Sequence, residues 1–567
     1  MNTMIGIDLG TSTTEAAVLR DGKPVMILNF EGEAVTPSVV GVDGEGKYVF
    51  GEQAKAQFLL EPENTVIEMK RKMGTGEMIP MGGRDYTPVE LSAMLLAHVK
   101  SYAEEFLGEE VSRAVISVPA YFDERRRQET VEAGKRAGFT VERIINEPTA
   151  AALSYGIEHM EEESHILVYD LGGGTFDVTL LEMFGGVLEV KASSGDNQLG
   201  GKDFDECLVE WLVQQFQARY GINLRKSAAA RVKLKEQAER CKKELSASDS
   251  CRVVIPFIAE KDGKPLALEE TITVRQFEEL TRRLVERTHK PIDIVLADSG
   301  VRPADIDRIL LVGGSTRMPM IARDIETYLH QPPSAAVNPD YAVAEGTAIQ
   351  AGIMEGTLAG ENGIVMTDVN PYTLGVRALN DFGWDCMSVV IPRNVTIPAV
   401  REKIYYTSFD GQTEAHIEVY QGDSSKVEEN HFLGDFLLSG IPSGRAGKEE
   451  IAVEFSYNLN GMLEVRARIV STGEEAGVEI NMLKTELSEE KEKRDVSGWK
   501  TAEHAKRFRT VIRRAERRLG HEEACKDSLY YVELEESLYE LKLALLEEDL
   551  ERAEEIEEEI LDMLGNK

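Results

Sequence analysis

The chain has 567 residues, more than one hydrophobic core usually supports, so we expect several domains. Hydrophobic residues make up 42% and charged residues 29%, as in ordinary globular proteins, and the formal net charge is -36. So acidic a chain disfavours nucleic acid as a partner, because phosphate contacts are made mainly by Lys and Arg. The start lacks a signal-peptide pattern and no apolar run approaches about 20 residues, so no membrane span is expected.

Cysteine usage favours a reducing, cytoplasmic setting. The number of cysteines is odd and no C-x-x-C spacing occurs, which argues against a disulfide framework or a zinc site: Cys207, Cys241, Cys251, Cys386 and Cys525. Cys241 falls within a helical pattern, where a small packed side chain is the expected role. A redox switch is the alternative interpretation.

Residues 1–358 alternate strand-like apolar runs with longer helical patterns, which is typical of an α/β domain. The strand-like runs include "MIGIDLG", "HILVYDLG", "FDVTLLEMF" and "RILLVGG". The helical patterns include "VELSAMLLAHVKSYAEEFL" and "DECLVEWLVQQFQARYG".

The pattern changes twice beyond this domain. Gly, Asn and Pro interrupt it in a linker over 359–369, and short alternating runs with turn signals then predict an all-β module over 370–484. Apolar residues at helical spacing follow over 485–567, and Gly565 marks the end of the last helix. The chain is therefore expected to contain a large α/β domain, a linker, a β module and a helical tail.

Two glycine-rich hairpins carry the chemistry of the α/β domain. In "IGIDLGTSTTEAAVL", Asp8 ends an apolar strand and precedes Gly10, Thr11 and Ser12; in "YDLGGGTFDVTLLE", Asp170 precedes three glycines and Thr175. The two aspartates occupy matching places, which predicts an internally duplicated fold. A third turn, "LLVGGSTRMP", follows another strand. Glycine turns leave backbone N–H groups free to bind phosphate, so a nucleotide is expected here rather than simple tight hairpins.

Carboxylates beside a phosphate would repel it unless a cation lay between them. Asp8 and Asp170 therefore predict Mg²⁺, held mostly through water. The P-loop pattern G-x-x-x-x-G-K-[ST] is absent, and so is the dinucleotide pattern G-x-G-x-x-G after a strand.

At this point the motifs resemble those of the seventy-kilodalton heat-shock chaperones, the DnaK family. The likeness rests on "IDLGTS", "VISVPAYFDERRRQ", "RIINEPTAAALSYG", "YDLGGGTFDVTLLE", "GDNQLGGKDFD", "LVGGSTRMP" and "NPDYAVAEGTAIQAG", which occur in the family's order. The short segment between Lys70 and Leu91, with "VMTDVNPYTLGV" and "FSYNLNGMLEV", is most similar to the bacterial HscC branch. The resemblance implies an actin-like ATPase domain, a β-sandwich peptide-binding domain and a C-terminal helical lid.

The resemblance also assigns residues to an ATP and ADP site. Lys70 would place and polarise the attacking water; Asp8, Glu147 and Asp170 would hold Mg²⁺ through water; and Asp177 would order the lytic water and a monovalent cation, K⁺. Thr175 joins Lys70, Glu147, Asp170 and Asp177 in the implied catalytic set. The implied nucleotide contacts are Asp8, Gly10, Thr11, Ser12, Thr13, Lys70, Gly172, Gly173, Gly174, Thr175, Gly201, Glu239, Lys242, Lys243, Ser246, Gly313, Gly314, Ser315, Arg317 and Asp340. No strong general base is visible, so slow hydrolysis is expected.

The resemblance further implies peptide binding and its control by ATP. Extended apolar peptides would contact Met387, Tyr405, Ser408, Ala415 and Ile417. ATP would dock the linker and β module on the ATPase domain, although "GIVMTD" has Thr367 where the family has an apolar residue, so docking is expected to be weaker. Arg143, Asn146 and Asp368 match positions that contact J-domain partners, and an exchange factor is also expected.

Two other functions compete with a general ATP-dependent chaperone. The protein could use the same ATPase switch as a dedicated regulator of one or a few clients. Sugar kinases and actin-like filament proteins share the phosphate hairpins, but neither explains the residues after 370.

Overall fold

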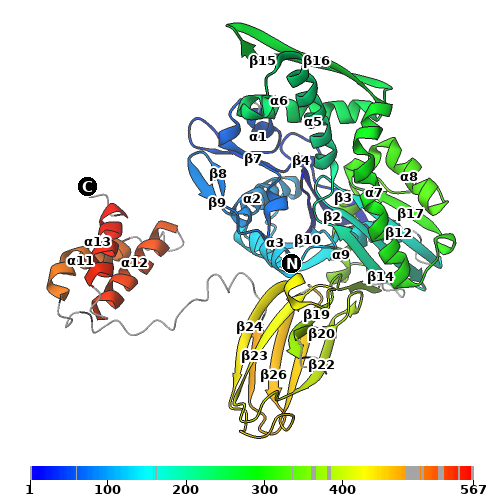
Figure 1. Cartoon of the computed structure of the whole chain (residues 1–567). Helices are drawn as coiled ribbons and strands as arrows, with labels where there is room; N and C mark the ends of the chain where they lie inside the picture. The colour runs from blue at the N-terminus through cyan, green and yellow to red at the C-terminus, as the bar shows by residue number, and fades with distance from the viewer. Residues whose placement is uncertain are drawn as a thin grey trace. The chain divides into compact units, whose positions relative to one another are not determined.

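The computed structural model describes residues 3–58, 60–157, 159, 162–334, 336–358, 365–379, 385–460, 462–479, 499, 504–521, 529–546 and 550–563. The chain forms two compact units, Met1–Leu483 and Lys484–Lys567 (Figure 1). Most of the predicted linker, residues 359–364, lies outside the described residues, as do 380–384 and 480–484 of the predicted β module and much of the predicted tail.

Two six-stranded sheets form the centre of the α/β part. The first has the order β11-β10-β1-β2-β3, with β4 also paired to β2. Its strands are β1 (Met4–Leu9), β2 (Thr13–Arg20), β3 (Lys23–Met26), β4 (Val35–Pro37), β10 (Arg113–Val118) and β11 (Thr140–Asn146). The second has the order β17-β12-β13-β14-β18-β21. Its strands are β12 (Ser164–Leu171), β13 (Phe176–Phe184), β14 (Val187–Asp196), β17 (Arg308–Val312), β18 (Val365–Val369) and β21 (Thr396–Ile397).

The predicted internal duplication is visible in strand pairing. In each sheet a central strand pairs in parallel with one neighbour and forms an antiparallel hairpin with the next strand along the chain: β1 with β10 and β2, and β12 with β17 and β13. Asp8 pairs with Glu15 across the first hairpin, and Asp170 with Asp177 across the second. Both hairpins therefore carry a facing pair of acids next to their glycine turn.

Two helices fill the space between the sheets. α4 (Glu147–Gly156) and α9 (Ala342–Met354) pack against each other, α9 against the first sheet and α4 against the second. Small side chains such as Ala150 and Ala351 let these elements approach closely within a fully buried cluster. The two halves of the α/β part are thereby held together below the hairpins.

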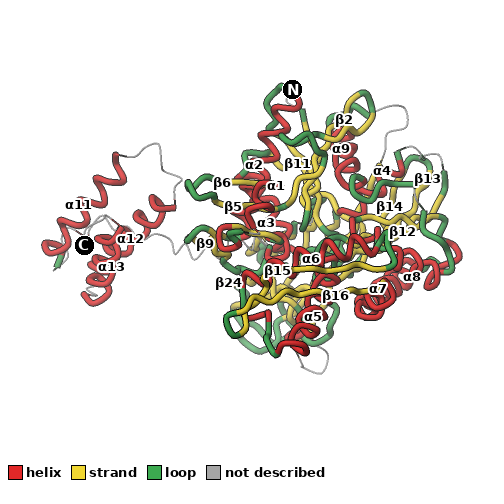
Figure 2. Tube along the Cα trace, turned by 90° about the horizontal axis from the view of Figure 1, so that it is seen from above, coloured by secondary structure: helices red, strands yellow, loops and turns green. Residues whose placement is uncertain are grey.

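The remaining elements of the α/β part enlarge each half. The first half adds α1 (Gly51–Phe58), α2 (Pro88–Leu107), α3 (Glu124–Arg136), β5 (Val39–Val42), β6 (Tyr48–Phe50), β7 (Thr65–Ile67), β8 (Ile79–Met81), β9 (Arg84–Tyr86), η1 (Pro62–Asn64) and η2 (Met69–Lys72). The second adds α5 (Gly201–Tyr220), α6 (Ala228–Leu245), α7 (Val274–Ser299), α8 (Pro319–Leu329), β15 (Ser250–Lys261), β16 (Lys264–Thr273), η3 (Leu224–Lys226), η4 (Pro303–Asp305) and η5 (Gly314–Arg317). Figures 1 and 2 both show β15 and β16 running side by side as one long hairpin.

Local sequence explains where the predicted helix α2 begins and ends. Thr87 and Glu90 form a reciprocal capping box at its start, and Gly108 ends it in a left-handed conformation, with φ 74°. Several of its apolar residues, including Leu95 and Val99, are fully buried.

The β module is a sandwich of two four-stranded sheets, as predicted. Their orders are β20-β19-β23-β24 and β22-β25-β26-β27. The strands are β19 (Leu374–Leu379), β20 (Asp385–Ile391), β22 (Ala399–Tyr406), β23 (Glu414–Gln421), β24 (His431–Ser439), β25 (Glu450–Tyr457), β26 (Leu463–Ile469) and β27 (Glu475–Glu479), with the short helix η6 (Val427–Glu429). Alternating side chains such as Val453 and Phe455 of β25 help to form its buried core.

The sandwich is docked on the α/β part through β18. This strand adds in parallel to the edge of the second sheet, with Val365 opposite Val187 and Thr367 opposite Glu189. It also pairs with β21, so one strand joins both parts of this unit. The resemblance implied this docking, but no local pattern of the sequence specifies that β18 pairs with β14.

The second unit is helical, as predicted. It contains α11 (Ala505–His521), α12 (Leu529–Leu546) and α13 (Leu550–Met563), whose apolar faces form a buried cluster around Phe508 and Leu541. Among the described helices, none has the length and apolar character needed to cross a membrane.

Candidate functional site

The two glycine hairpins meet at a cavity of about 470 Å³ between the halves of the α/β part. Nearly all residues expected at a nucleotide line it: Asp8, Gly10, Thr11, Ser12, Thr13, Lys70, Glu147, Asp170, Gly172, Gly173, Thr175, Gly201, Glu239, Lys242, Lys243, Ser246, Gly313, Gly314, Ser315, Arg317 and Asp340. Gly174 and Asp177, which the sequence also placed at the site, do not line this cavity. Asp177 is only 1% exposed and lies behind it, opposite Asp170.

Glycine is required where the turns approach one another. A Cβ atom on Gly173 would lie 2.3 Å from Ser12 Oγ of the other hairpin. Gly313 has φ +81°, and a Cβ there would lie 2.7 Å from Asp170 Oδ1. The three predicted turns therefore pack directly against each other, and a larger residue at either position would separate them.

A buried lysine stands among the carboxyl groups. Lys70 lies in η2 and is 5% exposed, and its Nζ is 2.5 Å from Glu147 Oε1 at the start of α4. Ser117 Oγ donates to Asp8 Oδ1 at 2.7 Å, and the Tyr121 backbone N–H donates to Asp177 Oδ1 at 2.9 Å. The site thus contains more acidic than basic groups.

Burial shifts the protonation of these acids. Burial, with the charge of Glu147, raises the pKa of Asp8 to about 6 and that of Asp177 to about 7. The same causes raise the pKa of Asp170 well above its ordinary value. A cation in this cleft would favour their charged forms, so the donor set fits a bound cation. Within the described residues, no three His, Cys, Asp or Glu side chains are arranged to hold a metal ion by themselves.

Helix α6 lines the far side of the cavity with the expected residues. Lys242 Nζ lies 2.9 Å from Asp205 Oδ1 and donates to Gly201 O at 2.9 Å. Glu239 pairs with Lys243 at 2.8 Å. Arg317 pairs with Asp340 at 2.5 Å from the opposite side. These ion pairs position the charged side chains around the cavity mouth.

Cys241 of α6 faces the core and not the cavity. It is fully buried, in the same hydrophobic cluster as Cys251. Burial is the main reason that the pKa of Cys241 is raised, which disfavours the reactive thiolate. The packed role expected from the sequence therefore fits better than a redox switch.

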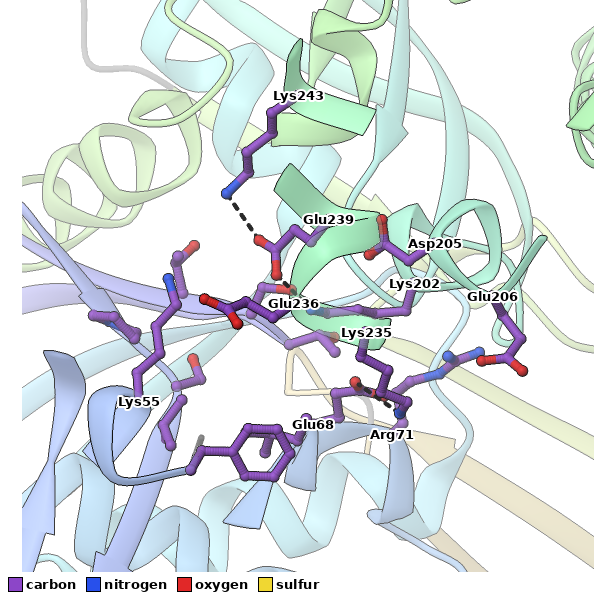
Figure 3. A pocket seen from close by; sticks show the side chains of 18 of the residues that line it. Lys55, Glu68, Arg71, Lys202, Asp205, Glu206, Lys235, Glu236, Glu239 and Lys243 are labelled. Atoms are coloured by element: carbon purple, nitrogen blue, oxygen red, sulfur yellow. Dashed lines mark hydrogen bonds and ion pairs between the residues drawn. The ribbon is translucent and has the colours of Figure 1, made fainter. Parts of the chain in front are cut away.

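The outer part of the cleft is a second cavity of about 460 Å³, which shares Thr11, Ser12 and Glu239 with the inner one. Figure 3 shows the charged side chains around it, which come from both halves. Arg71 pairs with Asp203 at 3.2 Å, and Lys235 with Glu68 at 3.8 Å. Both pairs bridge the two halves of the α/β part.

Several residues at the site were not predicted from the sequence. Glu15 lines the inner cavity and is 3% exposed, and burial, with the charge of Asp8, raises its pKa well above the ordinary value. The sequence did point to Glu15, because it follows Asp8 by seven residues, as Asp177 follows Asp170. Arg71 and Asp203 gave no comparable signal, since their pairing depends on elements far apart in the chain.

The three residues expected to contact J-domain partners, Arg143, Asn146 and Asp368, lie close together. Asn146 Nδ2 donates to Asp368 Oδ1 at 2.8 Å, and Arg127 Nη2 donates to Asn146 Oδ1 at 2.8 Å. Burial lowers the pKa of Arg143, and the charge of Asp368 opposes this. The Thr367 hydroxyl is buried without a hydrogen-bond partner.

The residues expected to bind peptide do not all come together. Tyr405, Ala415 and Ile417 pack, half-buried, against the sandwich core, and Tyr405 Oη donates to Ser388 Oγ at 2.9 Å. Ser408 lies in the following loop, where its backbone N–H donates to Gln412. Met387 lies on β20 opposite Arg377 of β19 and is 8% exposed, and its role in peptide binding stays a prediction.

Two exposed apolar side chains at the same end of the sandwich were not among the residues expected to bind peptide. Leu379 is 53% exposed at the end of β19, and Phe409 is 59% exposed beside Ser408. The register of β19 and β23 brings the end of β19 to the start of β23, next to the loop that carries Phe409.

Comparison with known proteins finds one matching family model and several similar proteins. The family model described as Hsp70 protein matches residues 4–81 and 76–564. Chaperone protein DnaK of Thermotoga petrophila and that of Thermotoga maritima are each 45% identical over 534 residues, which cover 94% of this chain and 88% of theirs. Chaperone protein DnaK of Thermosipho africanus is 42% identical over 552 residues, covering 96% of this chain and 90% of its own.

Proposed function

Because the chain belongs to the Hsp70 family of ATP-dependent molecular chaperones, which are ATPases that bind client polypeptides, we propose how its parts divide the work. ATP binding and hydrolysis between the two glycine hairpins switch the sandwich between low and high affinity for extended apolar segments. The observation that carries this proposal is the docking of β18 onto the sheet that contains Asp170 and Asp177. ATP and peptide can then both shift the equilibrium between the docked and undocked states of this contact.

The proposed domains are 1–358 for nucleotide, 359–369 for the linker, 370–484 for peptide and 485–567 for the lid. Separate buried clusters support the division of the described residues, and β21 of the proposed peptide domain joins the second sheet through β18.

The inner cavity supports a phosphate and Mg²⁺ site. The turns after β1 and β12 would donate backbone N–H groups to the phosphates, and Thr11, Ser12 and Thr175 would add hydroxyls. Asp8, Glu147 and Asp170 would hold Mg²⁺ through water, which would offset phosphate charge. K⁺ would lie near Asp177. Glu239, Lys242 and Lys243 of α6 and Ser246 directly after it, with Arg317 and Asp340 opposite, would hold the adenosine.

The proposed hydrolysis needs little covalent chemistry from the protein. Lys70, held by Glu147, would orient and polarise the water that attacks the γ-phosphorus in line. Asp177 would help to order that water from the layer behind Asp170. Slow turnover is proposed, and it would suit a role as a timer.

Co-chaperones are proposed at the interdomain contact. Arg143, Asn146 and Asp368 are expected to respond to a J-domain partner. Asn146 and Asp368 are buried against each other here, so such a partner would act through Arg143 and alter this contact. An exchange factor for nucleotide is proposed on the family's precedent alone.

A dedicated client regulator is the second candidate function. Tyr405 and Ser408 place hydroxyl groups at the expected peptide site, which favours a narrower peptide preference than a wholly apolar pocket. The motifs most similar to the HscC branch support the same reading, although the relatives above carry the name DnaK. We also propose a cytoplasmic location, which the free thiols of the four described cysteines support.

The decisive test is steady-state ATP hydrolysis by the full chain, with and without a panel of apolar peptides and a J-domain protein. We expect slow basal turnover that both additions accelerate. A rate indifferent to every addition would contradict the proposed coupling. Acceleration by one peptide sequence only would favour the dedicated regulator over the general chaperone.

A further inference from the structure

A buried acid of the α/β part faces the sandwich, through a contact other than β18. Glu124 is the first residue of α3 and is 2% exposed. Its Oε1 accepts a hydrogen bond from Gln128 Nε2 at 3.1 Å and another from the Leu463 backbone N–H of β26 at 3.4 Å. Asn460, between β25 and β26, accepts a hydrogen bond at its Oδ1 from the Ile144 N–H of β11 at 3.3 Å. The hairpin of β25 and β26 therefore covers Glu124 in the docked structure.

No ion pair neutralises Glu124 within the part of the chain that the structure describes. The three arginines that follow it in α3 are engaged elsewhere, with other acids or with carbonyl groups. Their partners are Glu129 at 3.2 Å for Arg125, Asp123 at 3.6 Å for Arg126, and Asn146 Oδ1 at 2.8 Å with two backbone carbonyls for Arg127. An ionised carboxylate that is buried without a paired cation is costly, so the neutral form is favoured at this position.

The groups that act on Glu124 come from both structural parts. Burial raises the pKa of Glu124 from an ordinary value of 4.5 to about 8, and the charge of Asp123 adds to this rise. The charge of Arg127 and the two hydrogen bonds act on this pKa in the opposite direction. On the sandwich side, Tyr457 of β25 is the titratable neighbour, and burial, together with the charge of Glu124, raises its pKa as well. Both groups are therefore neutral at pH 7 while the sandwich is docked.

We propose that Glu124 couples docking of the sandwich to a proton: its carboxyl binds a proton when the hairpin of β25 and β26 covers it, and releases that proton to water when the hairpin leaves. This proposal rests on the ATP-controlled docking proposed above and adds the proton to the ligands that shift it. An uncovered carboxyl regains contact with water, so its pKa falls back toward the ordinary value. Between that value and about 8 the docked state then holds more protons than the undocked state, so docking weakens as pH rises and the dependence ends above pH 8.

Protons and peptide would then act on docking in opposite directions. Peptide binding favours the undocked sandwich and is expected to accelerate hydrolysis, so a rise in pH should act in the same direction as peptide. A fall in pH should hold the protein in the docked state, in which hydrolysis is slow. Because Asp177 in the cleft also titrates near pH 7, docking rather than the rate of hydrolysis is the quantity to measure.

The test compares the full-length parent protein with Glu124→Gln, and Glu129→Gln is the matched control. Glu129 is a buried acid of the same helix, but its partners, Arg125 and the Gly74 backbone N–H, belong to the α/β part. The ratio of linker cleavage rates by a protease with Mg·ADP and with Mg·ATP gives the docking constant and cancels the protease's own response to pH. We expect this constant to fall about tenfold between roughly pH 6.5 and pH 7.5 in the parent protein and in Glu129→Gln, because one proton is released. The Glu124→Gln side chain cannot ionise, so this variant should stay docked at both values.

A second substitution and a second readout separate proton binding from a general change at the interface. Glu124→Asp keeps an ionisable carboxyl, so its docking constant should still fall as pH rises. In the parent protein, peptide should accelerate hydrolysis by a smaller factor at about pH 8.5 than at about pH 6.5, whereas in Glu124→Gln the two factors should be equal. A docking constant that does not change with pH in the parent protein, or that falls equally in Glu124→Gln, would overturn the proposal. If ATP protects the linker at no pH, the proposed function is contradicted instead.

Discussion

The two halves of the α/β part carry the same hairpin in different surroundings. In the first sheet Asp8 faces Glu15, and in the second Asp170 faces Asp177. The first sheet ends at β3, whereas the second continues through β14 to β18 and thereby joins the sandwich. Duplication supplied matching acids, but only the second half is connected through its sheet to the part expected to bind peptide.

The hydrogen bonds that these acids accept also differ between the two halves. Asp8 receives a side-chain hydroxyl from Ser117 in its own sheet, whereas Asp177 receives a backbone N–H from Tyr121 in the other half. A side-chain donor can turn independently, but a backbone donor moves with its loop. The second hairpin is therefore more sensitive to movements between the halves.

The largest expected effect comes from removing the lysine that stands between the hairpins. Lys70→Ala should lower the rate of ATP hydrolysis at least about 100-fold, because a cation expected to orient the water and to offset developing charge is lost. Nucleotide affinity, measured by calorimetry, should be largely intact. The matched control is Lys72→Ala in the same turn, whose ammonium pairs with exposed Glu77 at 2.6 Å. Unchanged turnover in Lys70→Ala would remove this residue from the mechanism.

Matched substitutions at the two hairpins test whether their acids have diverged. Asp177→Asn should slow hydrolysis about 100-fold, since it changes a carboxylate expected to order the water. Glu15→Gln should change the rate far less and raise the melting temperature, because it removes a buried acid beside Asp8. Single-turnover rates and thermal unfolding of both variants check this. Equal losses of activity would mean that the two hairpins contribute alike.

The raised pKa values predict how the stability of the nucleotide-free protein depends on pH. Asp177 has a pKa of about 7 against an ordinary value of 3.8, so between these values the folded protein binds more protons than the unfolded chain. Its stabilising contribution is therefore greater at low pH and is lost as pH rises through 7, by about 1 kcal/mol between roughly pH 6 and pH 8. Thermal unfolding at both values measures this. Asp177→Asn should flatten the dependence, and a persisting slope would assign it to other groups.

The smallest expected effect concerns Thr367 in β18, the strand that joins the second sheet to the sandwich. The buried Thr367 hydroxyl has no partner in β18, so Thr367→Val should favour the docked state by about 1 kcal/mol. Protection of the linker from protease with ATP measures the docked fraction. Thr472→Val, in an exposed turn of the sandwich, is the control and should not change it. A lower docked fraction in Thr367→Val would show that the hydroxyl is satisfied by water.

Much of the fold and of the nucleotide site followed from local patterns. Alternation along "HILVYDL" and "FDVTLLEMF" predicted β12 and β13, and the glycines between them predicted a turn near a phosphate. Glu15 could have been found from the repeated seven-residue spacing.

The sequence by itself determined the paired hairpins, because strand alternation and turn length fix which side chains of neighbouring strands face each other. It also determined the family, because several long motifs occur in one order. Tertiary structure alone decided that Lys70 meets Glu147, that β18 adds to the second sheet, and that Tyr372 contacts Tyr121. Those partners are 77, about 180 and 251 positions apart, and such contacts depend on how finished elements pack, which no local pattern encodes.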